Sequence, residues 1–161
     1  MKELKLIEHA FNSRSKYDQI TLSDQLTESE QAEVDKFVGK HWSSINCKML
    51  SDYFEVINWL SPEAFCYFLP GIISAGIKES KPDLLIYDSI IYMLDRSSNV
   101  EYWDDFFKSR WTELSKSECE AVESWLYWLF ENNNDFDDVT IFNTLNTIEL
   151  LKDLTDKNQT Q

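Results

Sequence analysis

Side chains that act as nucleophiles, metal ligands or proton carriers are scarce in this chain and poorly spaced for catalysis. The two histidines, His9 and His41, do not occur in a metal-binding spacing such as HExxH. The three cysteines, Cys47, Cys66 and Cys119, are far apart and odd in number, so we expect reduced, buried thiols. The sequence therefore predicts no metal site, no cofactor and no enzymatic activity.

Two glycines and several paired carboxylates resemble parts of known catalytic motifs. Gly71 and Gly76 have the spacing of a phosphate-binding loop, but Ile77 stands where that loop needs lysine. Pairs such as Asp137-Asp138 are abundant, yet nothing in the sequence indicates that one carboxyl is buried with a raised pKa, as acid–base catalysis requires. We therefore reject both interpretations.

Asp88 is the most unusual polar residue, because it interrupts the apolar segment 84–94. If its side chain is buried, it must be hydrogen-bonded, and Tyr92, Ser89 or a neighbouring helix end could provide the partner. We expect Asp88 to take part in a structural network rather than in catalysis.

The charge of the chain is strongly negative and unevenly distributed. It has 161 residues, with 29 acidic against 15 basic residues and a net charge of -14. Residues 101–161 alone contain fourteen acidic and five basic residues, a net charge of -9. Such a surface repels phosphate and anionic lipid, so we expect direct binding to neither nucleic acid nor a membrane.

The composition and the start signals of the predicted elements indicate an all-α fold. Three glycines and three prolines are too few for the many turns of a β-sandwich. Thr27 with Glu30 and Ser115 with Glu118 fit the capping box, in which side chains satisfy free N–H groups at a helix start. Ser61 before Pro62 fits a helix N-cap followed by proline at the first helical position.

We predict one compact bundle of seven to eight helices over residues 1–154, followed by a flexible polar tail over 155–161. The helices are expected at about 2–12, 28–39, 47–59, 62 onward, 82–95, 100–112, 116–131 and 137–154. The helix beginning at Pro62 is apolar almost all round, which predicts a central buried helix with a kink or a break at Pro70-Gly71. Segment 84–94 is also rich in strand-forming residues, but its length and spacing favour a helix.

Within 116–131, acidic residues line one helix face away from the apolar stripe. They occur with a tyrosine at i, i+3, i+7 and i+11, a composition typical of contact surfaces. A solvated face is the simpler interpretation of each acidic cluster alone, and Asp104 has a candidate ion-pair partner in Lys108. Their joint clustering in one third of the chain nevertheless favours a negative surface that binds a basic protein. The predicted partner-binding residues are Asp104, Asp105, Glu120, Glu123, Tyr127, Glu131, Asp135, Asp137 and Asp138.

Four tryptophans fall within the same acidic third of the chain. We expect most of them in the core, with Trp125 and Trp128 at the edge of the apolar stripe and partly exposed. Aromatic rings beside carboxylates are typical of binding hot spots for basic partners.

The segment Trp59-Leu60-Ser61-Pro62-Glu63-Ala64-Phe65-Cys66-Tyr67-Phe68-Leu69-Pro70 resembles a family of small, all-helical, uncharacterised bacterial proteins. The resemblance extends weakly through 84–94 and to Leu114-Ser115 with Trp125-Leu126. It implies a helical fold and supplies no active-site residues. In size, acidity and helical content, the chain also resembles the immunity proteins of bacterial toxin–immunity pairs, including those of contact-dependent growth inhibition.

The resemblance and the charge together predict an immunity protein or inhibitor that neutralises a basic toxin domain, with a nuclease as the expected class. The alternative is a helical adaptor or homodimeric scaffold, in which acidity serves only solubility. An enzyme of unrecognised type is the least favoured hypothesis. The N-terminus lacks the unbroken apolar run of a signal peptide, and the apolar run 64–77 is too short to cross a bilayer, so a cytoplasmic location is expected.

Overall fold

The computed structural model describes residues 1–159, and no strand occurs among them. The all-α prediction is confirmed, including the helical assignment of 84–94. The helices are α1 (Lys2–Phe11), α2 (Glu28–Asp35), α3 (Cys47–Asp52), α4 (Pro62–Glu79), α5 (Leu85–Leu94), α6 (Asp105–Trp111), α7 (Lys116–Asn132) and α8 (Asp138–Gln159), with 3-10 helices η1 (Trp42–Ser44), η2 (Phe54–Asn58) and η3 (Val100–Tyr102).

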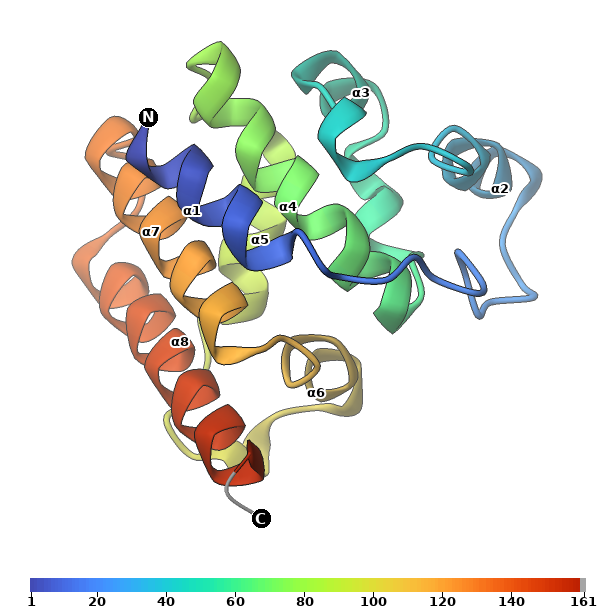
Figure 1. The fold of residues 1–161 in the computed structure, drawn as a ribbon. Coiled ribbons are helices and arrows are strands. Elements are labelled where there is room, and N and C mark those ends of the chain that lie inside the picture. Colours follow the sequence, from blue (N-terminus) through green and yellow to red (C-terminus); the bar gives the residue numbers. More distant parts are fainter. Residues whose placement is uncertain (160–161) are drawn as a thin grey trace.

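Helix α4 forms the centre of the bundle. It contacts α1, α3, α6, α7 and η1, and every residue from Ala64 to Ile77 is buried. Figure 1 shows α1 crossing in front of α7 and α4, with α7 and α8 packed side by side and α5 behind α4. Helix α7 is thus held between α1 and α8, which leaves one side of it exposed.

The central helix continues through Pro70, so this proline does not split it. The neighbouring Gly71 has a separate role, because a side chain there would collide with the backbone carbonyl of Trp42. The absence of a side chain therefore allows η1 to pack directly on α4.

A second close approach joins α4 to α5. The Tyr87 hydroxyl donates to the carbonyl of Ile72 at 2.8 Å and accepts from the N–H of Gly76 at 2.9 Å. It therefore lies between two backbone groups that would pair with each other in an uninterrupted helix. Any side chain on Gly76 would collide with this hydroxyl. Tyr87 thus fixes the position of α5 against the central helix.

The helix starts predicted from the caps at Thr27, Ser61 and Ser115 are confirmed, whereas the helix expected from Pro82 begins only at Leu85. Both capping boxes form, with Thr27 accepting from the N–H of Glu30 and Ser115 accepting from the N–H of Glu118. Ser61 caps α4 directly before Pro62. These starts were predictable because the residues that make each cap are neighbours in the sequence.

The helix expected over 28–39 ends at Asp35 and continues as turns. Two other predicted helices are wrong in extent because each is interrupted. The expected helix 47–59 ends at Asp52, where Tyr53 leaves helical geometry, and continues as η2. The expected helix 100–112 divides into η3 and α6, because Asp104 adopts extended backbone and caps a new helix. Helix α8 continues to Gln159, beyond the predicted end at 154. The last two residues of the predicted tail, 160–161, lie outside the described residues.

Candidate functional site

Four predicted site residues lie on α7 and form what we call the α7 stripe: Glu120, Glu123, Tyr127 and Glu131. All but Glu123 are exposed. Both Glu123 carboxylate oxygens accept from Lys152 Nζ at 3.1 Å, and Lys152 also pairs with Glu149 at 2.6 Å. The burial of Glu123 raises the pKa of its carboxyl. Part of this stripe is therefore occupied by an ion-pair network with α8.

Asp104 and Asp105 lie at the start of α6. Asp104 Oδ1 accepts from the N–H of Phe107 at 2.8 Å, and Asp104 Oδ2 pairs with Arg96 at 2.7 Å. These two contacts lower the pKa of the Asp104 carboxyl. The expected pairing with Lys108 is wrong, because Asp104 precedes the helix as its cap and faces the end of α5.

Asp135, Asp137 and Asp138 lie at the start of α8, as predicted, and all three are exposed. Asp137 Oδ1 accepts from the N–H of Thr140 at 2.7 Å, and this hydrogen bond lowers the pKa of the Asp137 carboxyl. The first turns of α8 join α5 through Asp95, which accepts from Thr140 Oγ1 at 3.4 Å and from Asn143 Nδ2 at 2.9 Å.

The structure divides the nine predicted residues between two sides of the molecule. Helices α5 and α7 point Tyr87 and Trp125 toward each other, with ring centroids 5.0 Å apart. Tyr127 follows Trp125 by two residues, so it lies about 200° further around α7 and faces away from α5. The residues at the starts of α6 and α8 instead border the outer side of α5. Tyr127 and the acidic residues at the start of α6 therefore do not lie on one side of the molecule.

The outer side of α5 carries a second group of exposed aromatic and acidic side chains. Tyr92 is 83% exposed, Tyr102 is 75% exposed and Phe106 is 39% exposed. Two clefts, of about 620 and about 360 Å³, share Tyr92, Arg96 and Asp104 in their walls. We call this surface the α5 face. It comprises Leu85, Asp88, Tyr92, Asp95, Arg96, Tyr102, Asp104, Phe106 and Val139.

Asp88 belongs to the α5 face, and the expected structural network around it is wrong. Its side chain is exposed and has no hydrogen bond or ion pair within residues 1–159. Partial burial, together with the nearby charge of Asp135, raises the pKa of its carboxyl. This face was not predicted from the sequence, although Asp88, Tyr92 and Asp95 at i, i+4 and i+7 form a polar stripe that indicates it.

The four tryptophans of the acidic third are buried in the core, although Trp103 also lies in the wall of the smaller cleft on the α5 face. Trp125 is completely buried and Trp128 is 9% exposed, so the predicted partial exposure of both is wrong. The physical reason is that α7 is covered by neighbours on three sides, since α1 and α8 flank it and α5 approaches through Tyr87. The exposed rings beside carboxylates are tyrosines and a phenylalanine.

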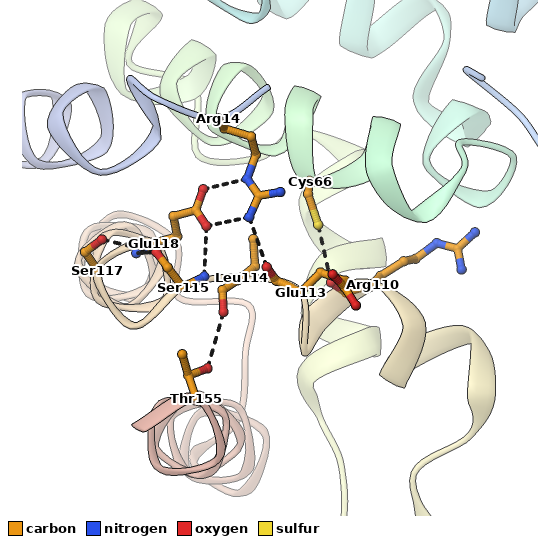
Figure 2. A network of polar contacts seen from close by, with 9 residues as sticks. All are labelled: Arg14, Cys66, Arg110, Glu113, Leu114, Ser115, Ser117, Glu118 and Thr155. Atoms are coloured by element: carbon orange, nitrogen blue, oxygen red, sulfur yellow. Dashed lines mark hydrogen bonds and ion pairs between the residues drawn. The ribbon is translucent and has the colours of Figure 1, made fainter. Parts of the chain in front are cut away.

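A partly buried polar network holds the start of α7 and is shown in Figure 2. Arg14 donates from Nε and Nη2 to the two carboxylate oxygens of Glu118, each at 2.6 Å, and Nη2 also donates to the carbonyl of Glu113 at 3.0 Å. Glu118 Oε1 also accepts from the N–H of Ser115 at 2.8 Å. These hydrogen bonds give the ionic groups of Arg14 and Glu118 partners within the protein. The pair therefore has a structural role and joins the segment after α1 to the start of α7.

A cleft of about 520 Å³ lies beside this network, with Arg14 and Cys66 in its wall. Burial raises the pKa of the Cys66 thiol to about 12, and the thiol donates to the carbonyl of Arg110 at 3.3 Å. Such a thiol is neutral at pH 7 and therefore a poor nucleophile. All three cysteines are buried and unpaired, as predicted.

Residues 1–159 contain no group of three histidine, cysteine or acidic side chains that is placed to hold a metal ion. Nor does any described helix combine the length and apolarity needed to cross a membrane.

Comparison with known proteins gives a family and no characterised relative. No curated protein and no solved structure matches the chain. A family model described as "Family of unknown function (DUF6714)" matches residues 3–147, a span that includes every helix from α2 to α7 and both surfaces described above. The chain therefore belongs to this family of unknown function, DUF6714.

Proposed function

We propose that this protein is a non-catalytic inhibitor of the immunity-protein type, which binds a basic protein domain through the α5 face. The observation that carries the proposal is the exposure of Tyr92, Tyr102 and Phe106 beside Asp88 and Asp95 on a chain of net charge -14. Large exposed rings are costly to leave in water, and they are typical anchors of protein interfaces.

Charge and apolar area have separate roles in this mechanism. The negative field of the acidic helices attracts a cationic domain and raises the association rate above the roughly 10⁵–10⁶ M⁻¹s⁻¹ of uncharged partners. The exposed rings then become buried against the partner and slow dissociation. The α7 stripe lies on another side of the molecule, so it adds to the negative electrostatic field and does not contact the docked domain.

The proposed partner is a toxin domain, and a nuclease is the favoured class. A nuclease binds phosphate with a basic surface, so carboxylates on this protein can occupy the same groups and block substrate. Such a pair would act in the cytoplasm, as immunity proteins of contact-dependent growth inhibition do. The proposal is supported by the exposed rings and carboxylates of the α5 face and by the resemblance to immunity proteins in size, acidity and helical content.

The experiment tests, as the partner, a small basic domain sought among the products of the genes adjacent to that of this protein. We expect coexpression of this protein to restore growth to cells that express the basic domain. We also expect the rate at which the two proteins associate to fall steeply as salt is increased. Tyr92→Ala should weaken binding about tenfold, which corresponds to about 1.4 kcal/mol. Tyr127→Ala removes a ring that is 53% exposed on the α7 stripe, and binding should change by less than about twofold. Binding that is independent of salt and of Tyr92 would contradict the proposal.

A homodimeric scaffold is the second candidate, and one observation favours it. Val139 and Phe142 are both exposed and lie one turn apart on α8, where a second copy could cover them. Sedimentation velocity separates the two functions. A dimer that persists on dilution and in high salt supports the scaffold, whereas a monomer supports the inhibitor.

A further inference from the structure

The larger cleft on the α5 face has the size and lining of a site for one long side chain. It measures about 620 Å³ and lies between α5 and α6, close to the end of η2. The lining residues used below are Asn58, Asp88, Tyr92, Arg96, Asp104 and Phe106. Their side chains provide ring surfaces, carboxylates and an amide at one opening.

The charges in this cleft leave one carboxylate without a counterion. Arg96 is compensated by Asp104 at 2.7 Å, and its guanidinium also lies 4.3 Å from the ring centroid of Phe107. The other carboxylate oxygen of Asp104 accepts from the N–H of Phe107. Asp88 has no such partner within residues 1–159. The cleft is therefore short of one positive charge.

The rings provide a surface on which a planar cation can stack. Tyr92 lines the cleft and is 83% exposed, so most of its ring is accessible to a ligand. The chain itself places guanidinium groups over neighbouring rings, since Arg110 Cζ lies 3.6 Å from the centroid of Phe106. Stacking of arginine on aromatic rings is thus compatible with the local geometry of this surface.

We propose that this cleft receives an arginine side chain of the basic partner, with its guanidinium stacked on Tyr92 and paired with the carboxylate of Asp88. The inference rests on the proposed function and adds the chemistry that the partner must present. Arginine fits better than lysine because its planar fork can stack on a ring and pair with a carboxylate at the same time. The Asn58 side chain adds a carbonyl oxygen as a further acceptor for the remaining N–H groups.

The test uses blocked arginine, N-acetyl-arginine methylamide, as the probe, with amide chemical shifts of the full-length protein as the readout. We expect saturable shifts with a millimolar Kd, confined to residues around the cleft. Blocked citrulline is the matched control ligand, because it keeps the shape of arginine and lacks the charge. We expect blocked citrulline not to bind and blocked lysine to bind more weakly than arginine.

Two pairs of variants locate the site. Asp88→Asn should weaken arginine binding about fivefold, whereas Glu131→Gln, which removes the same charge from the α7 stripe, should change it by less than about twofold. Tyr92→Ala should abolish the cleft shifts, and Tyr127→Ala should preserve them. These exposed positions are expected to tolerate substitution without unfolding.

Three results would overturn the inference. These are equal shifts with citrulline, equal affinity for lysine and arginine, or a response of the α7 stripe as large as that of the cleft. The proposed function can fail or stand independently. If arginine does not enter the cleft but the basic domain still binds in a manner that depends on Tyr92 and salt, the inhibitor function stands and only this inference is lost.

Discussion

The α5 face and the α7 stripe contain the same components, an exposed tyrosine among carboxylates, but their charges differ in how they are compensated. On the α7 stripe, Glu123 is paired with Lys152 and held against α8. On the α5 face, Asp88 has no counterion within the described residues, and two clefts open beside Tyr92. The two surfaces therefore share a composition and differ in the pairing of Glu123 and Asp88 and in the clefts beside Tyr92.

The largest expected effect comes from destabilising α7, the helix that carries the α7 stripe, while leaving α5 intact. Glu118→Ala removes the counterion of Arg14, whose side chain is 21% exposed, and also one half of a capping box. The unfolding free energy should fall by about 3 kcal/mol, measured by chemical denaturation. Hydrogen exchange should accelerate at the start of α7 more than in α5.

Glu120→Ala is the matched control for this prediction, since Glu120 lies two residues away and is exposed. Its effect should stay within about 0.5 kcal/mol. Equal losses for the two variants would show that the Arg14–Glu118 contact does not contribute specifically to stability.

A smaller effect tests the compensation of charge on the α7 stripe. Lys152→Met leaves Glu123 and Glu149 close together without a counterion, so stability at pH 7 should fall by about 1 kcal/mol. The pKa of Glu149 is lowered by its contacts with Glu123 and Lys152, so the stability that it contributes is lost as the pH falls. The difference between wild type and variant should therefore shrink in acid.

Lys108→Met serves as the control for the loss of one positive charge at an exposed site. Thermal unfolding at several pH values compares each variant with the wild type and shows how each difference depends on pH. A loss that is as large for Lys108→Met, or that does not depend on pH, would contradict the assigned network.

The smallest effects distinguish two aspartates within the α5 face, and they should have opposite signs. The Asp104 pKa is lowered, so its charge stabilises the protein above its ordinary pKa of 3.8 and that stability is lost as the pH falls. The pKa of the Asp88 carboxyl in the folded protein is raised above the ordinary 3.8. Ionisation of Asp88 therefore costs stability, and this cost is complete once the pH has risen through the raised folded-state pKa. At pH 7, Asp104→Asn should lower Tm slightly and Asp88→Asn should raise it slightly.

The difference for Asp88→Asn should vanish below the ordinary pKa of aspartate, whereas the difference for Asp104→Asn should vanish only in stronger acid, below the lowered pKa of the Asp104 carboxyl. Thermal unfolding at pH 7 and in strong acid measures them. A decrease in Tm for Asp88→Asn at pH 7 would show that Asp88 has a structural role, and it would remove the contrast between the two aspartates.

The features that could be predicted from the sequence are those that residues close together in the chain determine. The caps at Thr27, Ser61 and Ser115 were predictable because each depends on residues within one turn. The α7 stripe was predictable because its residues share one face of a single helix. The central position of α4 followed from its apolar composition on all sides.

What could not be predicted depends on contacts between distant segments. The capping role of Glu118 was evident, but its ion-pair partner Arg14 lies 104 residues away. The α5 face combines side chains from α5, α6 and α8, so no single helical period contains it. Burial of Trp125 required knowing that α5 covers this side of α7, which periodicity within α7 alone does not indicate.

The hydroxyl that joins Tyr87 to the backbone of α4 has a consequence for recognition. Asp88 follows Tyr87 directly, so the carboxylate that would meet a partner is next to a residue that two hydrogen bonds hold against the central helix. A surface on such a support is already ordered before any encounter, and little conformational entropy is lost on association. Complex formation on this face should then proceed as the docking of rigid bodies, without a slow rearrangement after the first contact.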